Sequence, residues 1–408
     1  MMERSKCMNV PEIRFKEFCD YYNDVLLEKC LSVSNKKNNK LEYKKEDALS
    51  VSDEFGVVNQ IEHLGRSYTG NNISTYKILN KGQIVYTKSP LKLKPFGIIK
   101  VNNNKPGIVS VLYAIYDVKE GFDPNYISVY FEPSFRLNKY LLPLINKGAK
   151  NTINISDETA LSGEVHIPLS HAEQQKIVSY FQSLDSLIQI ISKKLASLKR
   201  IKAASLQSMF PQEGETVPKV RFKGFKEGWE KEKLGNLFKE RIENNINGEL
   251  LSVTINNGII KASDNGRFDN SNNDKSHYKV VKIGDIVYNT MRMWQGASGY
   301  SAYEGIVSPA YTVIIPQEQV FPLFFAYLFK TQSLINRFRI HSQGLTTDTW
   351  NLKFAGFSII EVCFPKSKLE QQKIASYFCN LDKQISLQTQ RLEKLKQIKA
   401  ACLDKMFV

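Results

Sequence analysis

Two polar segments in the second half of the chain carry side chains of the types that hydrogen-bond DNA base edges. Arginine, glutamine, asparagine and threonine supply donors and acceptors for such contacts in the major groove, and tryptophan can pack on a sugar or a methyl group. The first segment is 289–300, and its candidates are Asn289, Thr290, Arg292, Trp294 and Gln295. The second is 341–351, and its candidates are Gln343, Thr346, Thr347 and Trp350. The competing interpretation is a solvated loop over a buried tryptophan.

The first half of the chain offers lysines and asparagines in corresponding places. Segment 87–97 holds three lysines that suit phosphates, namely Lys88, Lys92 and Lys94. Phosphate contacts position a protein on DNA without specifying a sequence. The run VNNNKPG (101–107) adds Asn102, Asn103 and Lys105, although a hairpin turn explains an asparagine run at least as well. The loop 146–152 adds Lys150 and Asn151.

Signatures of catalysis are missing from the sequence. The dipeptide Gly-Lys never occurs, which excludes a P-loop of the usual kind. The segment DPNY (123–126) is only faintly like the Asp-Pro-Pro-Tyr motif of amino-methyltransferases, and an Asp-Pro turn is the simpler interpretation. The five histidines form no paired ligand spacing. We therefore predict a non-catalytic chain with no metal and no cofactor.

Length, composition and charge favour a large intracellular protein with a polyanionic partner. The 408 residues suffice for two domains with connecting elements, and 42% hydrophobic residues suffice for packed cores. A net charge of +15 favours nucleic acid or an anionic membrane surface as the partner. No apolar run reaches the roughly 20 residues of a membrane span. The six cysteines include no Cys-x-x-Cys pair, which argues against a zinc finger and favours a reducing cytoplasm.

The elements that must position these loops are repeated along the chain. The pentapeptide EQQKI occurs at 173–177 and 370–374, and a match without gaps continues from it at an offset of 197 residues to Met209-Phe210 and Met406-Phe407. Both copies begin with a capping box, Ser170-x-x-Glu173 and Ser367-x-x-Glu370. We predict that each copy forms a helix of about 39 residues, about 58 Å long.

Apolar residues in both predicted helices alternate in steps of four and three, which is the seam of a coiled coil. In the first copy they are Ile177, Phe181, Leu184, Ile188, Ile191, Leu195 and Leu198. The second copy keeps the steps but has one polar member, Gln388. Three shorter repeats lie upstream of the helices: VPEIRFKEF with VPKVRFKGF, YKILNKGQIVY with YKVVKIGDIVY, and GIVS twice. The chain is therefore predicted to be two tandem copies of one α+β unit.

The predicted geometry is an antiparallel helix pair with one domain at each end and an approximate two-fold axis across the middle. Two spaced readers of this kind suit two DNA half-sites at a fixed separation, with the helices as the ruler. The boundaries that we predict are 1–168 and 211–366 for the two domains, and 169–210 and 367–408 for the two helices.

This architecture resembles the specificity (S) subunit of type I restriction-modification systems. The most specific features are the two EQQKI helix starts, each after an apolar-proline element, HIPLS (166–170) and CFPKS (363–367), and the start of the second unit, VPKVRFKGFKEGWE. The resemblance implies two target recognition domains that each read half of a bipartite site in double-stranded DNA. It also implies that the helices space the domains and dock two methyltransferase (M) subunits, which two restriction (R) subunits join.

Two other functions compete with this reading. A coiled-coil scaffold could carry two domains that bind something other than DNA, and a steep loss of DNA affinity with salt would distinguish the DNA reader from it. A self-sufficient methyltransferase is the third possibility, and methyl transfer by the chain alone would reveal it.

Overall fold

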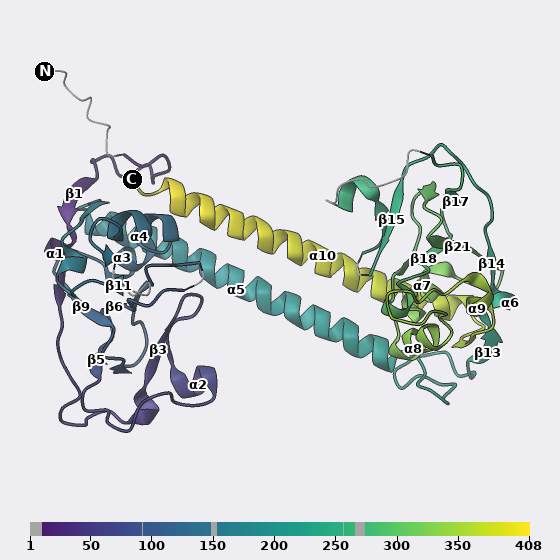
Figure 1. Ribbon diagram of the computed structural model, residues 1–408, viewed down its shortest axis with the longest axis horizontal. Coiled ribbons are helices and arrows are strands. Elements are labelled where there is room, and N and C mark those ends of the chain that lie inside the picture. Colours follow the sequence, from purple (N-terminus) through teal and green to yellow (C-terminus); the bar gives the residue numbers. More distant parts are fainter. Residues whose placement is uncertain (1–9, 92, 148–152, 256, 266–273) are drawn as a thin grey trace, which may run out of the picture. The chain divides into compact units, whose positions relative to one another are not determined.

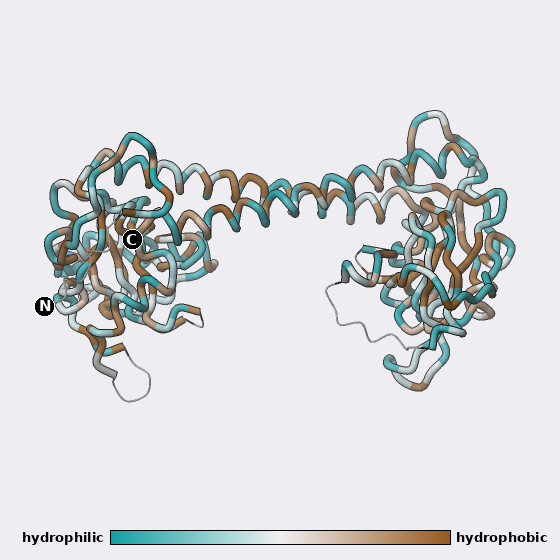
Figure 2. The backbone as a smooth tube through the Cα atoms, turned by 90° about the horizontal axis from the view of Figure 1, so that it is seen from above, coloured by the Kyte–Doolittle hydropathy of each residue, from teal (hydrophilic) through white to brown (hydrophobic). Residues whose placement is uncertain are grey.

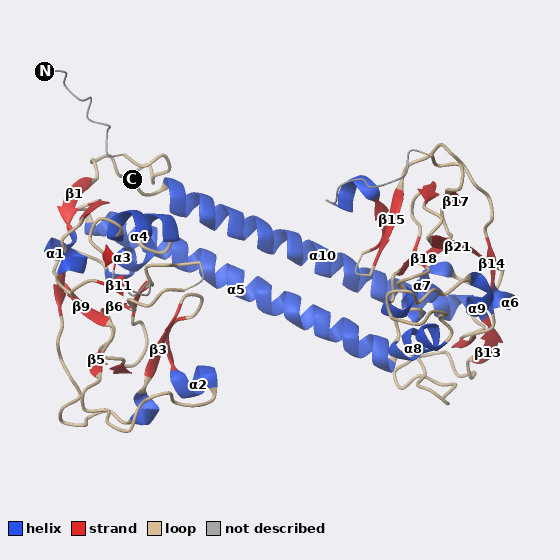
Figure 3. Cartoon of the chain, in the orientation of Figure 1, coloured by secondary structure: helices blue, strands red, loops and turns tan. Residues whose placement is uncertain are grey.

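The computed structural model describes residues 10–91, 93–147, 153–255, 257–265 and 274–408. The chain divides into two compact units: residues 1–191 with 391–408 form unit 1, and residues 192–390 form unit 2. Short strands and helices mix in both units, so each is α+β (Figures 1 and 3). Parts of two 38-residue helices, α5 (His171–Ser208) and α10 (Lys368–Lys405), belong to each unit.

Unit 1 is built on a four-stranded antiparallel sheet in the order β2-β9-β6-β7. Its strands are β2 (Leu31–Val33), β9 (Ala114–Val118), β6 (Ile84–Tyr86) and β7 (Ile99–Val101). Four antiparallel pairs complete the strands: β1 (Asn23–Leu26) with β12 (Glu164–Ile167), β3 (Leu49–Ser52) with β4 (Gly56–Asn59), β5 (Lys77–Leu79) with β8 (Gly107–Val109), and β10 (Asn146–Lys147) with β11 (Ile153–Asn154). The helices are α1 (Leu27–Cys30), α2 (Gln60–Leu64), α3 (Pro124–Tyr130) and α4 (Ser134–Leu141), with short 3-10 turns at Lys45–Asp47 and Thr159–Leu161.

Unit 2 repeats this topology. Its four-stranded antiparallel sheet has the order β14-β21-β18-β19, with strands β14 (Phe238–Glu240), β21 (Tyr311–Pro316), β18 (Ile286–Asn289) and β19 (Ser298–Tyr300). The strand pairs are β13 (Glu230–Lys233) with β22 (Glu361–Phe364), β15 (Leu251–Thr254) with β16 (Gly258–Lys261), and β17 (Lys279–Val281) with β20 (Gly305–Val307). The helices are α6 (Leu234–Leu237), α7 (Pro322–Leu328), α8 (Gln332–Ile340) and α9 (Phe354–Ser358), and the 3-10 turns are Ala262–Asn265 and Met293–Gln295. The sequence repeats therefore correspond to a repeated fold.

The repeated GIVS segments mark a close backbone approach in each unit. A Cβ atom on Gly107 would lie 2.3 Å from the carbonyl oxygen of Asp47, and one on Gly305 would lie 2.3 Å from that of Glu249. No side chain fits at such a distance, so glycine is required where β8 and β20 lie against the segments just before β3 and β15.

The two long helices bury the seam that the heptad pattern predicts. Positions 177, 181, 191, 195 and 198 of α5 are buried, and positions 184 and 188 are half-buried. The polar seam residue Gln388 is buried as well, with 5% of its surface exposed. Hydrophobic and hydrophilic residues alternate along both helices (Figure 2). None of the helices in the described part of the chain is long and apolar enough to cross a membrane.

Within each unit the helix ends pair in antiparallel fashion through equivalent residues. In unit 1, Lys399 Nζ lies 2.6 Å from Asp185 Oδ1, and the Tyr180 hydroxyl lies 3.3 Å from Cys402 Sγ. In unit 2, Lys202 Nζ lies 2.5 Å from Asp382 Oδ1, and Ser205 Oγ lies 2.9 Å from the Tyr377 hydroxyl. At the offset of 197 residues, Lys202 corresponds to Lys399 and Asp185 to Asp382. Each lysine therefore pairs with the aspartate of the other copy.

The first turn of each long helix is fixed by a buried ion pair. Ser170 Oγ accepts a hydrogen bond from the Glu173 amide at 3.3 Å, as the capping box predicts. The Glu173 carboxylate, however, binds the Arg14 guanidinium through two hydrogen bonds of 2.7 Å. The copy is the same: Glu370 binds Arg221 at 2.7 and 2.8 Å. These glutamates thus anchor the helices to the upstream repeats VPEIRFKEF and VPKVRFKGF, which contain the two arginines.

The first glutamine of each EQQKI copy lies in the joint between helix and domain. The buried Gln174 side chain accepts from the Asp123 amide at 2.8 Å and donates to the Pro168 carbonyl at 2.9 Å. Gln371 makes the same contacts with the Phe321 amide at 2.7 Å and the Pro365 carbonyl at 2.9 Å. The next residue, Gln175, is exposed.

Each core is closed by a phenylalanine from the end of a long helix. Phe407 stacks on Phe181 with ring centroids 6.1 Å apart and belongs to the core of unit 1. Phe210 stacks on Phe378 at 5.8 Å and belongs to the core of unit 2. The repeated Met-Phe dipeptides are therefore core residues of the domains.

Candidate nucleic-acid interface

The two candidate loops of unit 2 meet in the structure. The rings of Trp294 and Trp350 pack edge to face with centroids 5.1 Å apart. The Leu352 amide also donates to the Thr290 carbonyl at 2.9 Å. One loop follows β18 and contains the 3-10 turn Met293–Gln295, and the other follows α8. The sheet and a helix therefore hold the two polar segments together as one surface.

Candidates on this surface differ in how far they are available to a ligand. The side chains of Arg292, Gln343, Thr346 and Thr347 are exposed, and those of Asn289, Trp294, Gln295 and Trp350 are half-buried. Thr290 is buried, and its hydroxyl donates to the Ala310 carbonyl at 2.9 Å. Thr290 therefore supports the loop from inside, and the exposed set carries the donors that can meet DNA.

The loop 341–351 is held in shape by its own hydrogen bonds. Gln343 and Asn351 exchange backbone hydrogen bonds of 3.0 and 2.8 Å. Thr349 Oγ1 accepts from the Thr346 amide at 3.1 Å. Gly344 has φ +143°, and a Cβ there would lie 2.6 Å from the Thr349 carbonyl. The exposed side chains of the loop therefore project from a backbone that the Gln343–Asn351 hydrogen bonds close at its base.

Two candidate lysines of unit 1, Lys88 and Lys94, are engaged in contacts within the protein. The Lys88 ammonium pairs with Asp157 and donates to the Ile155 carbonyl at 2.9 Å. Lys77 pairs with the same carboxylate at 2.9 Å. Burial acts to raise the pKa of Asp157, but hydrogen bonds from the two lysines outweigh it, and the pKa lies below its ordinary value. Lys88 thus anchors its loop to the body of the unit.

The asparagine run of unit 1 lies between β7 and β8, which pair with different strands, so it is not the hairpin turn of the competing interpretation. It forms a local turn instead, in which Asn102 Oδ1 accepts from the Asn104 amide at 3.0 Å. Asn102 is fully buried, and its side-chain amide donates to the carbonyls of Leu79 and Lys105, each at 3.2 Å. Its burial leaves no face for a base, so the structure gives Asn102 a role in the turn. Asn103 and Lys105 are exposed. Three candidates, Lys92, Lys150 and Asn151, lie outside the described residues.

Sequence reasoning missed two half-buried lysines next to these loops. Lys330 follows α7, and burial lowers the pKa of its ammonium to about 8. Lys100 lies on β7, and burial lowers its pKa as well. Neither belongs to a motif, and only the folded chain brings them to the loops.

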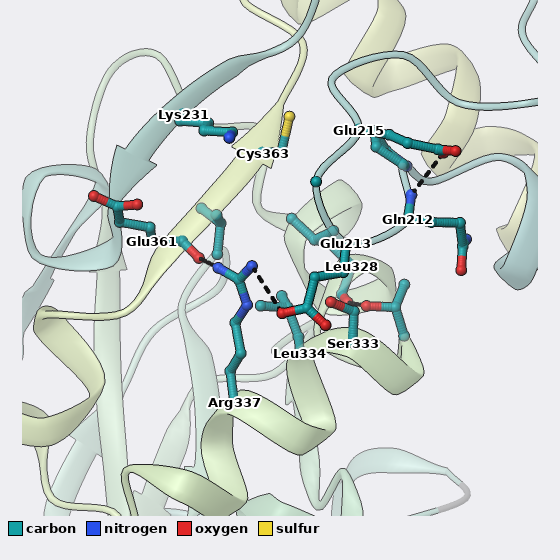
Figure 4. A pocket seen from close by; sticks show the side chains of 14 residues that line it. Gln212, Glu213, Glu215, Lys231, Leu328, Ser333, Leu334, Arg337, Glu361 and Cys363 are labelled. Carbon is teal, nitrogen blue, oxygen red and sulfur yellow. Dashed lines mark hydrogen bonds and ion pairs between the residues drawn. The ribbon is translucent and has the colours of Figure 1, made fainter.

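A small pocket in unit 2 is lined by a cysteine, a lysine and carboxylates (Figure 4). Arg337 crosses it, donating to the Glu361 carbonyl at 2.7 Å and lying 3.9 Å from the Glu213 carboxylate. Burial raises the pKa of the Cys363 thiol, which keeps it protonated and unreactive. The arginine therefore links the segment 211–215 to the rest of unit 2. Among the described residues, no group of three or more His, Cys, Asp or Glu side chains could hold a metal ion.

Residues 226–397 match the family model of the type I restriction modification DNA specificity domain. Most of unit 2 therefore resembles a type I DNA specificity domain. This match confirms the family resemblance that the repeated helix starts indicated. No curated protein matches the chain.

Solved structures of type I restriction-modification subunits are similar to this chain, and one of them has a TM-score that supports a shared fold. The S subunit of a type I restriction-modification system from M. genitalium superposes with a TM-score of 0.58 at 12% identity, covering 98% of this chain and 99% of that chain. The HsdS subunit from Thermoanaerobacter tengcongensis gives 0.46 at 14% identity, covering 95% and 96%. The M. genitalium structure and the elements described above confirm the predicted fold class, α+β with two tandem domains and two long helices.

Proposed function

We propose that the chain is the DNA-recognition subunit of a type I restriction-modification complex and that each unit reads one half of a bipartite duplex site. The observation that carries the proposal is the repeat: unit 1 has the topology of unit 2, and unit 2 matches a DNA specificity domain. Two readers on one chain suit a target with two parts. The family match does not favour a scaffold with non-DNA domains.

In unit 2 the exposed donors of the tryptophan-linked surface are the base and backbone readers. Arg292 can make a bidentate contact with guanine, and Gln343 one with adenine. Thr346 and Thr347 suit phosphates or base edges. In unit 1, Asn103 and Lys105 are the exposed candidates. Lys92, Lys150 and Asn151, which lie outside the described residues, stay candidates from the sequence alone.

The long helices space the two units and dock two methyltransferase subunits, with two restriction subunits completing the complex. Methyl transfer and cleavage belong to these partners, and this chain, acting in the cytoplasm, contributes recognition alone. The proposal for the helices rests on the family resemblance. The structure supports docking on the helices in one respect. Gln174 and Gln371 are buried between helix and domain, whereas Gln175 is exposed and available to a partner.

The test is sequencing of methylated bases in DNA from cells that express the chain with its methyltransferase subunits. Wild type should give one bipartite methylated motif. Arg292→Ala combined with Gln343→Ala should change or relax one half of the motif and leave the other half intact. Lys366→Ala, at an exposed lysine outside both loops, is the matched control. Absence of any methylated motif with the wild-type complex, or unchanged motifs in the double variant, would overturn the proposal.

Two further measurements test DNA binding and the spacer role of the helices separately. Affinity for duplex DNA should fall steeply as salt rises if many phosphates are contacted, and a flat response contradicts DNA binding. Deletion of one heptad from both helices should change the spacing between the half-sites and leave their sequences intact. A change in the half-site sequences would refute the role of the helices as a ruler.

A further inference from the structure

One lysine in unit 2 holds the candidate loop from behind. The Lys330 ammonium donates to three backbone carbonyls: that of Ser298 at 2.9 Å, that of Ile255 at 3.1 Å, and that of Gly296. Ile255 lies in the turn of the β15–β16 hairpin, and Gly296 and Ser298 end the loop that carries Arg292 and Trp294. An ammonium has three donors. Lys330 therefore has none left for a phosphate.

In unit 1 the corresponding lysine lies in the loop and reaches the hairpin and the helix end, whereas Lys330 lies at the helix end and reaches the hairpin and the loop. Lys94 lies in the loop itself, and its ammonium lies 2.5 Å from Asp53 Oδ1 and 2.9 Å from the Glu132 carbonyl. Asp53 lies in the turn of the β3–β4 hairpin, as Ile255 lies in the turn of β15–β16. Glu132 stands two residues after α3, as Lys330 stands two residues after α7. Each unit thus places an ammonium where the hairpin, the loop and the helix end meet; in unit 1 a second one, that of Lys100, lies 3.8 Å from the same Asp53 carboxylate oxygen.

We propose that Lys330 and Lys94 are positioning residues, which lock the candidate DNA-reading loops 289–298 and 87–97 in place and contact no phosphate. The inference rests on the proposed function of these loops and deepens it. For Lys94 it replaces the phosphate contact that the sequence suggests. The reason is electrostatic, because hydrogen bonds from a charged ammonium are stronger where little water competes for it. One lysine side chain can therefore hold the hairpin, the loop and the helix end together.

The charged surroundings of Lys330 explain why the site depends on carbonyls. Lys202 of α5 repels its charge, and Asp382 of α10 attracts it. Asp382 is already engaged, because it binds the Lys202 ammonium at 2.5 Å and accepts from the Tyr327 hydroxyl at 2.9 Å. The three carbonyls are therefore the direct partners that stabilise the ammonium.

The first test needs no DNA. Amide hydrogen exchange is compared between wild type, Lys330→Met and Lys366→Met, an exposed lysine of the same unit. In Lys330→Met, exchange at 289–298 should rise about tenfold or more, while β18 outside the loop and all of unit 1 stay protected. Lys366→Met should change nothing there. Unchanged exchange at 289–298 in Lys330→Met overturns the inference, and so does unfolding of all of unit 2.

The second test uses DNA and the methyltransferase subunits. Lys330→Met should lower the ratio of specific to non-specific affinity about tenfold and leave the salt slope unchanged, because no phosphate contact is removed. A salt slope that falls by about one unit would identify Lys330 as a phosphate contact and overturn the inference. If the loop loosens in the exchange experiment but wild type reads no DNA, the positioning role stands and the proposed function fails.

Discussion

Replacement of Arg221 by methionine should destabilise unit 2 strongly, because it strands a buried charge. Arg221 donates to both oxygens of Glu370 at 2.7 and 2.8 Å, and Glu370 has 1% of its surface exposed. Without the arginine, the remaining side-chain partner is the Trp229 indole at 3.4 Å. Breaking a buried ion pair in this way costs about 3–5 kcal/mol. An exposed pair would cost about 0–1 kcal/mol.

The assay must resolve the two units, since a chain with two cores need not unfold in one step. Native-state hydrogen exchange in urea gives a free energy of opening for each set of core amides. Arg221→Met should lower it in unit 2, and Arg14→Met, which breaks the equivalent pair with Glu173, should lower it in unit 1. Each variant is the control for the other.

A double variant shows whether the stranded charge is the cause. Adding Glu370→Gln to Arg221→Met removes the charge and keeps the shape, so the double variant should recover about 1–3 kcal/mol relative to Arg221→Met. The reasoning is refuted if Arg221→Met costs less than about 1 kcal/mol. It is also refuted if the double variant is no more stable than Arg221→Met.

Three other predictions concern single positions. Phe407→Ala should cost unit 1 about 3–5 kcal/mol in the same exchange assay, because the ring is 4% exposed in the core, and an effect on unit 2 alone would contradict this. Gly305→Ala should fail to give a folded unit 2 by near-ultraviolet circular dichroism, because its Cβ would lie 2.3 Å from a carbonyl oxygen; a native spectrum would show that the backbone can move apart. Burial lowers the pKa of Lys330 to about 8 from 10.5, so the folded unit loses this proton first as pH rises. The stability of wild type minus that of Lys330→Met should therefore rise between pH 8 and 10.5, and a fall would refute the assigned shift.

The helices and the repeat could be predicted from the sequence because their signals are local or periodic. The heptad steps from Ile177 onward need only neighbours three and four residues away, and the burial of that seam follows from the same periodicity. The serine of each capping box is equally local, and Ser170 caps as predicted. Spacing along the chain was sufficient for these elements.

The partners of buried charges could not be predicted from spacing. Glu173 is 159 residues from Arg14 in the sequence, and no local pattern around either residue predicts their contact. For the same reason Lys94 suited a phosphate in the sequence, whereas in the fold Asp53 and a carbonyl surround its ammonium. Asn102 shows the opposite case, because an asparagine run carries a local turn signal that competed with base reading. The structure contains a local turn there, closed by Asn102 and the Asn104 amide, although it contains no hairpin. Polar residues near a loop are thus ambiguous until their internal partners are known.

Under the proposed function, the crossed lysine–aspartate pairs bear on how the chain could change its target. Lys399 pairs with Asp185 in unit 1 and Lys202 with Asp382 in unit 2, and all four residues lie outside the segment 217–366. Exchange of that segment for another recognition domain therefore keeps the contacts that hold the helix ends together. Arg221, however, lies inside it, and its partner Glu370 lies outside. An incoming domain must consequently supply an arginine at this place, or it leaves the carboxylate at the helix start buried without its ion pair.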